Sequence, residues 1–363
     1  MHIPDGYLSP QTCAVGYVAA ASMWTAASRK VTKVVKTRNV PLLAVLAAVS
    51  FLIMMFNVPI PDGTTAHAVG GTLIAICLGP WAAVIAVSVA LLAQALLFGD
   101  GGVLTYGVNC VNMAIILPFV GYGVYLLVAG RTPLTSTLRV VAAAIGSYIG
   151  ICTAALACGI ELGIQPALFH SASGAPLYSP YTLSQSVPAM LLAHLTLAGV
   201  VEAVLTAGVV AYLQRADVSR LAINHPGIPI TAADAPARRS RLTPGRAAVG
   251  FIFVMVLLTP LGLLAPGGAF GEDAPNALNL HKLGLSAIPT GLAKYNGIWS
   301  HALLDGYGFH NGDNPDLGYV VSAIVGVAVI GMAIFLIGKL AQLLLRRRSS
   351  RSAGPLTTDE PRA

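Results

Sequence analysis

The chain has 363 residues, of which 56% are hydrophobic and 10% are charged. Soluble domains carry about 25% charged residues, so this composition excludes an ordinary soluble protein and predicts an all-α membrane protein with many spanning helices. The net charge of +7 would suggest nucleic acid if it formed a patch on a soluble domain. Because the basic residues here fall between apolar runs, we predict no nucleic-acid partner. Their positions instead indicate which loops lie in the cytoplasm.

The first seven residues offer a transition metal three nitrogen ligands. The α-amine of Met1, the backbone nitrogen of His2 and the imidazole of His2 can close two adjoining chelate rings. A deprotonated amide nitrogen is a strong-field donor that suits square-planar Ni(II) or Cu(II). The sequence shows no signal-peptide pattern, so we expect Met1 to be the mature terminus. Pro4 restricts Ile3 to extended conformations, so the start should not be helical. The alternative interpretation is that Met-His is merely how the chain begins.

Nine apolar runs are long enough, or nearly long enough, to cross a ~30 Å membrane core at about 20 residues each. They are 9–28, 41–57, 64–79, 81–98, 108–129, 138–160, 188–213, 247–264 and 318–345. Lys and Arg gather in four clusters, 29–38, 131–139, 215–246 and 339–362. With the amino terminus outside, nine alternating spans place all four clusters in the cytoplasm and leave Lys282 and Lys294 outside, as the positive-inside rule requires.

This pattern predicts a multi-pass protein of the cell membrane with about seven transmembrane helices followed by two more. Four regions are expected: a metal-binding transmembrane domain over 1–213, a cytoplasmic linker over 214–246, a two-helix extension with an external loop domain over 247–345, and a basic cytoplasmic tail over 346–363. The linker is read from its Pro, Ala and Arg content. All five cysteines lie in apolar segments without Cys-x-x-Cys spacing, so we interpret them as buried hydrophobic side chains.

A second candidate ligand follows the second span. The stretch Ile60-Pro61-Asp62-Gly63 echoes Ile3-Pro4-Asp5-Gly6, and His67 comes four residues later among small residues. The charge-derived topology puts His67 near the outer face, the same face as Met1. An ionisable residue at a membrane helix end is a functional-site candidate. The alternative is a histidine that hydrogen-bonds to a neighbouring helix.

These motifs, together with Gly101-Gly102-Val103-Leu104 and Gly107-Val108-Asn109-Cys110-Val111-Asn112-Met113, resemble the CbiM/NikM family over about residues 1–213. Members of that family are the substrate-capturing components of energy-coupling factor transporters for cobalt and nickel. The resemblance implies a seven-helix bundle whose amino-terminal segment folds inward. It also implies a square-planar metal site made by the Met1 amine, the His2 backbone nitrogen, the His2 imidazole and the His67 imidazole. Pro4-Asp5-Gly6 and Thr64-Thr65-Ala66-His67 look more like the nickel branch than the cobalt branch, whose members tend to carry Ser-Cys-Ser-His before the third helix. Ni(II) is therefore the expected substrate and Co(II) the alternative.

Several further polar residues stand out in apolar surroundings. Asn109 and Asn112 would share a helical face, and we expect them to orient the amino-terminal loop or its histidines, although amide bonding between helices is an equal alternative. Glu202 is interpreted as structural or coupling-related rather than as a ligand. Residues 247–345 resemble, less closely, a small accessory subunit fused to some family members. The loop histidines, which are His281, His301 and His310, match no compact ligand spacing and are interpreted as solvated.

The sequence also bears on other classes of function. A membrane-embedded metallohydrolase would need a metal with an open position and an acid–base carboxylate, and the chain has no His-Glu-x-x-His. A passive channel would need polar rings along several helices, and the predicted spans are too uniformly apolar for that. No Gly-x-x-x-x-Gly-Lys-[Ser/Thr] cradle for a nucleotide occurs. We therefore expect a non-enzymatic transport component that depends on a separate membrane coupling protein and on cytoplasmic ATPases.

Overall fold

The computed structural model describes residues 1–31, 39–60, 64–225, 227–228, 244–265, 268–310 and 312–352. Most of the predicted linker, the end of the predicted basic tail and the Pro61-Asp62-Gly63 turn lie outside these residues.

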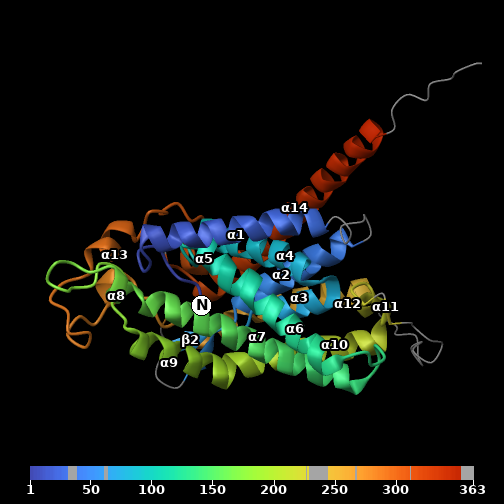
Figure 1. The fold of residues 1–363 in the computed structure, drawn as a ribbon, viewed down its shortest axis with the longest axis horizontal. Coiled ribbons are helices and arrows are strands. Elements are labelled where there is room, and N and C mark those ends of the chain that lie inside the picture. Colours follow the sequence, from blue (N-terminus) through green and yellow to red (C-terminus); the bar gives the residue numbers. More distant parts are fainter. Residues whose placement is uncertain are drawn as a thin grey trace, which may run out of the picture.

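The described part of the chain is an α-helical bundle with a single small hairpin (Figure 1). The longer helices are α1 (Pro10–Lys30), α2 (Val40–Met54), α3 (Gly71–Leu78), α4 (Pro80–Ala93), α6 (Leu117–Ala129), α7 (Thr137–Gly163), α9 (Leu183–Ala193), α10 (Gly199–Ala216), α12 (Pro244–Leu258) and α14 (Pro315–Ser352). The shorter helices are α5 (Tyr106–Asn109), α8 (Gln165–Leu168), α11 (Ser219–Ala222) and α13 (Thr290–Tyr295), and short 3₁₀ segments are η6 (Thr259–Leu264), η7 (Pro275–Ala277) and η8 (Asp305–Tyr307). Three π-helical segments continue longer helices: η2 (Gln94–Phe98), η3 (Cys110–Ile116) and η4 (His194–Ala198).

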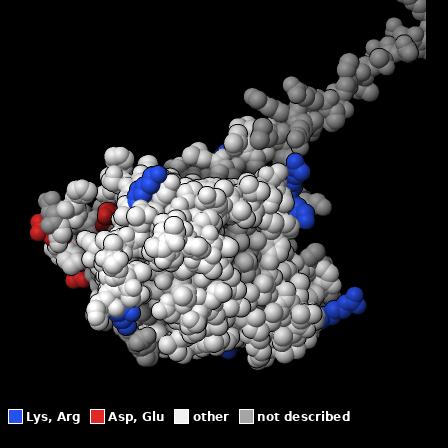
Figure 2. Space-filling view, turned by 60° about the vertical axis from the view of Figure 1, so that its left-hand side comes forward, with Lys and Arg blue, Asp and Glu red and all other residues white. Residues whose placement is uncertain are grey.

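The membrane character predicted from composition is confirmed. Six continuous helical stretches among the described residues are long and apolar enough to span: Pro80–Phe98, Tyr106–Ala129, Thr137–Leu168, Leu183–Ala216, Gly245–Leu264 and Pro315–Leu343. The shorter α2 is also apolar. Figure 2 shows a broad face of the bundle almost without charged side chains, with the acidic ones gathered at one end. Such a face is what lipid chains require.

The third predicted span differs from the expectation. Only Gly71–Leu78 of the run 64–79 is helical, and eight residues reach about 12 Å, less than half of the membrane core. Before it, β2 (Thr64–Ala66) pairs antiparallel with β1 (Val58–Ile60). Gly70 then turns the chain in a left-handed conformation with φ 76°. Hydropathy alone could not reveal this because a short helix that is buried in the protein is as apolar as part of a spanning helix.

The connections gather at the two ends of the bundle. One end carries the first nine residues, the loops 99–105 and 169–182, and the loop 265–314 between α12 and α14, which we call the extension loop (Figure 1). Hydrogen bonds tie these parts together, for example from Ser179 N to Tyr7 O at 2.9 Å and from Leu304 N to Leu97 O at 2.9 Å. The extension loop therefore packs on the bundle and covers the end where the chain begins.

Close packing of α6 on α7 depends on glycine. A Cβ atom at Gly121 would collide with the side chain of Thr72 and lie 3.0 Å from Gly146 O, whereas a Cβ at Gly123 of the same helix would meet nothing within 4 Å. Small residues that let helices approach closely are a main source of helix association in membranes.

We predict that Gly121→Ala lowers the stability of the bundle, because overpacking costs about 1–3 kcal/mol. Thermal unfolding of the detergent-solubilised protein measures this, and Gly123→Ala is the matched control with an unchanged or slightly raised midpoint. Equal midpoints for the two variants would contradict the close approach of α6 to Thr72 of α3 and to Gly146 of α7.

Candidate metal site

The amino-terminal segment runs into the bundle. Met1 and His2 are each 3% exposed and Ile3 is 1% exposed, and the terminus lies among the helices in Figure 1. Gly6 turns the chain with φ 93°. The Ser9 side chain then accepts a hydrogen bond at the start of α1, so the segment stays non-helical until that cap.

Ile3 is the point where the segment is anchored. Its N–H donates to Asn109 Oδ1 at 2.9 Å, and Asn109 Nδ2 donates to Ile3 O at 3.1 Å. Ile3 O also accepts from Gly102 N at 3.0 Å and from the Thr105 hydroxyl. The main chain next to His2 is therefore held on both its donor and its acceptor side.

Asp5 fixes the same segment through the loop before α5. Its carboxylate accepts from the backbone N–H groups of Val103 at 3.0 Å, Leu104 at 2.8 Å and Thr105 at 3.2 Å. Burial raises the pKa of Asp5, and these three donors act against that rise. The motif residues from the two distant stretches thus form one hydrogen-bonded unit.

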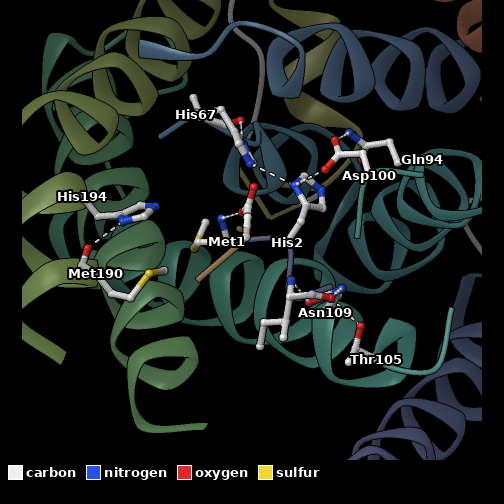
Figure 3. Close-up of polar contacts among 12 residues, drawn as sticks. Met1, His2, His67, Gln94, Asp100, Thr105, Asn109, Met190 and His194 are labelled. Atoms are coloured by element: carbon white, nitrogen blue, oxygen red, sulfur yellow. Dashed lines mark hydrogen bonds and ion pairs between the residues drawn. The ribbon is translucent and has the colours of Figure 1, made fainter. Parts of the chain in front are cut away.

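The two histidines predicted as ligands meet inside the bundle (Figure 3). His2 Nδ1 and His67 Nε2 are 3.1 Å apart, and the two rings are 4.8 Å apart between centroids. His67 Nδ1 lies 3.0 Å from Ala68 O, to which it donates when it carries the proton. That bond leaves the Nε2 lone pair directed at His2, the arrangement in which a histidine is a metal ligand.

The separation of the two nitrogens fits neighbouring corners of a square. Metal–imidazole bonds of about 2.0–2.1 Å place such nitrogens about 2.9 Å apart. Among the described residues, no three His, Cys, Asp or Glu side chains form a metal-binding group.

An acidic side chain lies beside His2. Asp100 Oδ1 is 3.2 Å from His2 Nδ1 (Figure 3). The Asp100 carboxylate also accepts from Gln94 Nε2 at 3.1 Å and from the hydroxyl of Tyr307. Tyr307 belongs to the extension loop, so this loop contributes to the surroundings of His2.

A second acidic side chain of the extension loop lies at the amino terminus. The Met1 amine is 3.3 Å from Glu272 Oε1. Nearby, Thr65 of the hairpin makes a β-bridge with Ala269. The extension loop is thereby attached to both chain segments that carry the predicted ligands.

These contacts change the proton affinities of the groups. Burial acts most strongly and lowers the pKa of the Met1 amine, but the Glu272 carboxylate and smaller contributions from other neighbours, Asp100 among them, together raise it above its usual value. Burial raises the pKa of Glu272. Burial, followed by the positive charge of the amino terminus, holds the pKa of His67 well below its usual value, so His67 is a neutral base.

Asn112 lies elsewhere than expected. Its Nδ2 donates to Glu161, and its Oδ1 has no hydrogen-bond partner among the described residues. No hydrogen bond joins it to the described amino-terminal segment.

His194 is also buried, and it lies near Met1, with its Nδ1 2.8 Å from Met190 O (Figure 3).

Irregular helix geometry surrounds the site. Gln94, Asn112 and His194 each belong to a π-helical segment, η2, η3 and η4 respectively. Such segments are rare and occur frequently at functional sites, because the widened turn redirects a side chain. Here they interrupt three of the long apolar helices in the region of the amino terminus.

The remaining candidates are peripheral or structural. His281, His301 and His310 are exposed on the extension loop, in agreement with the solvated interpretation. The five cysteines are unpaired and buried, as predicted.

The sequence analysis missed Asp100, Glu272 and Tyr307. A signal existed for Asp100, which directly precedes the Gly101-Gly102 motif. For Glu272 the only signal was an acidic pair in a loop, and its partner lies 271 residues away.

The fold and site together define a polytopic membrane protein that gathers nitrogen donors and carboxylates around its own buried amino terminus. A family model described as CbiM, cobalt uptake substrate-specific transmembrane region, matches residues 2–219. The fused nickel transport protein NikMN of Rhodobacter capsulatus is 47% identical over 358 residues, covering 95% of this chain and 99% of that protein. The probable fused nickel transport protein LarMN of Lactiplantibacillus plantarum is 45% identical over 338 residues, covering 92% and 96%.

Solved structures agree with these relatives. A crystal structure described as a truncated transition metal transporter is 57% identical and covers 59% of this chain and 98% of that chain, with a TM-score of 0.55. This chain belongs to the CbiM/NikM family of metal-transport membrane proteins, with a carboxy-terminal extension fused to the family domain. The relatives are named as transport proteins, which supports a transporter component and not the membrane metallohydrolase.

We predict that Asn109→Ala weakens the binding of a divalent transition metal about tenfold or more, because two hydrogen bonds to Ile3 are lost at about 1 kcal/mol each. Titration of the purified protein with Ni(II) measures the affinity. Asn112→Ala is the matched control, one helical turn away, and should change it less. The reverse ranking would show that Asn112 supports the site.

Proposed function

We propose that this chain is the substrate-binding membrane component of an ATP-driven energy-coupling factor importer whose substrate is Ni(II). The observation that carries the proposal is the 3.1 Å approach of His2 Nδ1 and His67 Nε2 next to the buried amino terminus. The family and the names of the full-length relatives support transport of such a metal.

The proposed site is planar with four nitrogens. The Met1 amine and the His2 amide nitrogen close one chelate ring, and the amide nitrogen and His2 Nδ1 close the next. His67 Nε2 takes the fourth corner, next to His2 Nδ1. This set places three neighbouring donors from one short segment in a plane, which favours low-spin Ni(II).

Charge around the site supports a cation as substrate. A divalent ion bound to one deprotonated amide retains a net positive charge, and the carboxylates of Asp100 and Glu272 lie beside the ligands. In a low-dielectric interior such carboxylates stabilise the ion strongly. Tyr307 and Gln94 in turn hold Asp100 in place.

Nickel is preferred over cobalt on the residues before His67, where Thr64-Thr65-Ala66 replaces the Ser-Cys-Ser of the cobalt branch. The family model is described by cobalt uptake, so Co(II) is the second candidate. Parallel titrations with the two ions test the choice, and tighter binding of Co(II) would reverse it.

The importer requires partners. We assign metal capture to residues 1–213, with the amino terminus on the outer face of the cell membrane, and the basic linker and tail to the cytoplasm. The absence of a nucleotide cradle from the sequence indicates that separate ATPases and a membrane coupling protein supply the energy.

A first prediction concerns the free amine. One residue added before Met1 turns the amine into an amide and moves His2 out of chelate register, so high-affinity Ni(II) binding should be lost. The same residue added after Ala363 is the control. Unchanged binding by the amino-terminally extended protein, with an unchanged absorption band, would disprove the ligand set.

A second prediction concerns protons. The Met1 amine has a raised pKa and must lose its proton, as must the His2 amide, whereas His67 is already neutral. About two protons should therefore leave these ligands for each ion, and the affinity should fall as the pH falls. Proton release in weak buffer measures the number, and an affinity independent of pH would exclude amine ligation.

A third prediction concerns energy. Cells that produce this chain alone should bind Ni(II) with little sustained accumulation, and co-production of the coupling protein and ATPases should restore uptake. Radioactive nickel accumulation measures the difference. ATP-dependent accumulation by the purified chain alone in liposomes would refute the component assignment.

A further inference from the structure

Glu202 of α10 is a carboxylate fully buried within a membrane-spanning helix. Its Oε2 accepts from Val69 N at 2.8 Å and from Gly70 N at 2.9 Å, and its Oε1 accepts from Gly70 N at 3.1 Å. A charged group at this depth is costly unless it is paired. Here its partners are backbone groups of another segment, immediately before α3.

Those partners lie two and three residues after His67. Residues 67–70 form neither helix nor strand, so the bonds of this segment to the bundle set the position of the His67 ring. The other bond is from Ser50 Oγ to Val69 O at 2.6 Å. Gly70 caps α3 without a side chain of its own, and Glu202 supplies the negative charge that a helix amino terminus favours.

The opposite end of α3 is held by the same part of the chain. Asn224, which follows α10 and α11, donates from Nδ2 to Ala75 O at 3.0 Å and to the hydroxyl of Tyr122 at 2.9 Å. A Cβ atom on Gly79 would lie 3.0 Å from Asn224 Oδ1, so the contact is close. The segment 199–224 therefore grips α3 at both ends.

We propose that Glu202 is a positioning residue for His67, and that α10, α11 and α3 connect the metal site to the opposite end of the bundle. This inference rests on the proposed function, because it assigns to Glu202 the placement of a metal ligand. Displacement of the segment 199–224 carries the 67–70 segment with it and withdraws His67 from His2. The ion is then left with the three donors of the amino terminus, and its release becomes easier.

The first test is Glu202→Gln, which keeps the shape but replaces one acceptor oxygen by a donor facing a backbone N–H. Ni(II) affinity should fall at least tenfold, and the absorption band should shift towards that of His67→Ala. Glu161→Gln is the matched control, since Glu161 is a partly buried acid of α7 whose side chain accepts a hydrogen bond from Asn112. It should keep the affinity and band of the parent protein.

A double-mutant cycle separates positioning from general stability. In the His67→Ala background, Glu202→Gln should cost no further affinity, because the residue acts through His67. An equal loss in both backgrounds, or no loss in the parent, would overturn the inference. Ser50→Ala removes the other bond to Val69 and should show a smaller loss with the same dependence on His67, which decides the case if Glu202→Gln does not fold.

The opposite end of α3 is tested with Asn224→Ala. It should lower Ni(II) affinity in the parent but not in the His67→Ala background, whereas Gln214→Ala, which removes bonds from α10 to Leu134 and Ser136, should leave it unchanged. Equal effects of Asn224→Ala and Gln214→Ala would overturn the role of α3. A parent protein that binds no Ni(II) would instead refute the proposed function itself.

Discussion

The structure depends on the enclosure of a charged amino terminus inside an apolar bundle. A buried ammonium group needs a partner of opposite charge, and Glu272 of the extension loop provides it at 3.3 Å from the Met1 nitrogen. The anchoring of Ile3 by Asn109 and of the 103–105 backbone by Asp5 keeps the segment in this place. Because the terminus is fixed, the position of His2 is fixed as well. The 67–70 segment then places His67 beside it.

Irregular backbone makes this arrangement possible within a membrane protein. Main-chain groups outside a helix are tolerated at membrane depth only where protein covers them. The segment 67–70 meets this condition through Glu202 and Ser50, and the first residues meet it through Asn109 and Gly102. The same requirement explains why Glu202, in a spanning helix, accepts from main-chain groups more than 130 positions away.

Local chemistry made part of the site predictable. The chelate rings proposed for Met1 and His2 follow from the adjacency of these two residues alone, and His67 stands out as an ionisable residue among small ones. Asn109 was recognised by its place in a motif, yet its neighbour Asn112 proved to bond to Glu161. Hydropathy predicted the membrane fold but read β2 and α3 as one span.

Long-range pairing was not predictable in the same way. Glu202 was recognised as exceptional because a charge in an apolar helix is costly, but nothing in the sequence connected it to residues 69 and 70. Glu272, Asp100 and Tyr307 depend on how the extension loop folds over the bundle. Such contacts follow from the packing of whole helices and not from the spacing of residues.

The pairing of Met1 with Glu272 joins the start of the chain to a residue 271 positions later. During synthesis Met1 leaves the ribosome before Glu272, which is made only after the family domain matched over residues 2–219 and all of α12. The Met1 amine therefore cannot pair with the Glu272 carboxylate while the helices between them insert. Contacts of such sequence separation form late, because closing a long loop costs entropy before any contact is gained. The contact between Met1 and Glu272, 271 positions apart, is thus expected to be among the last to form as the chain folds.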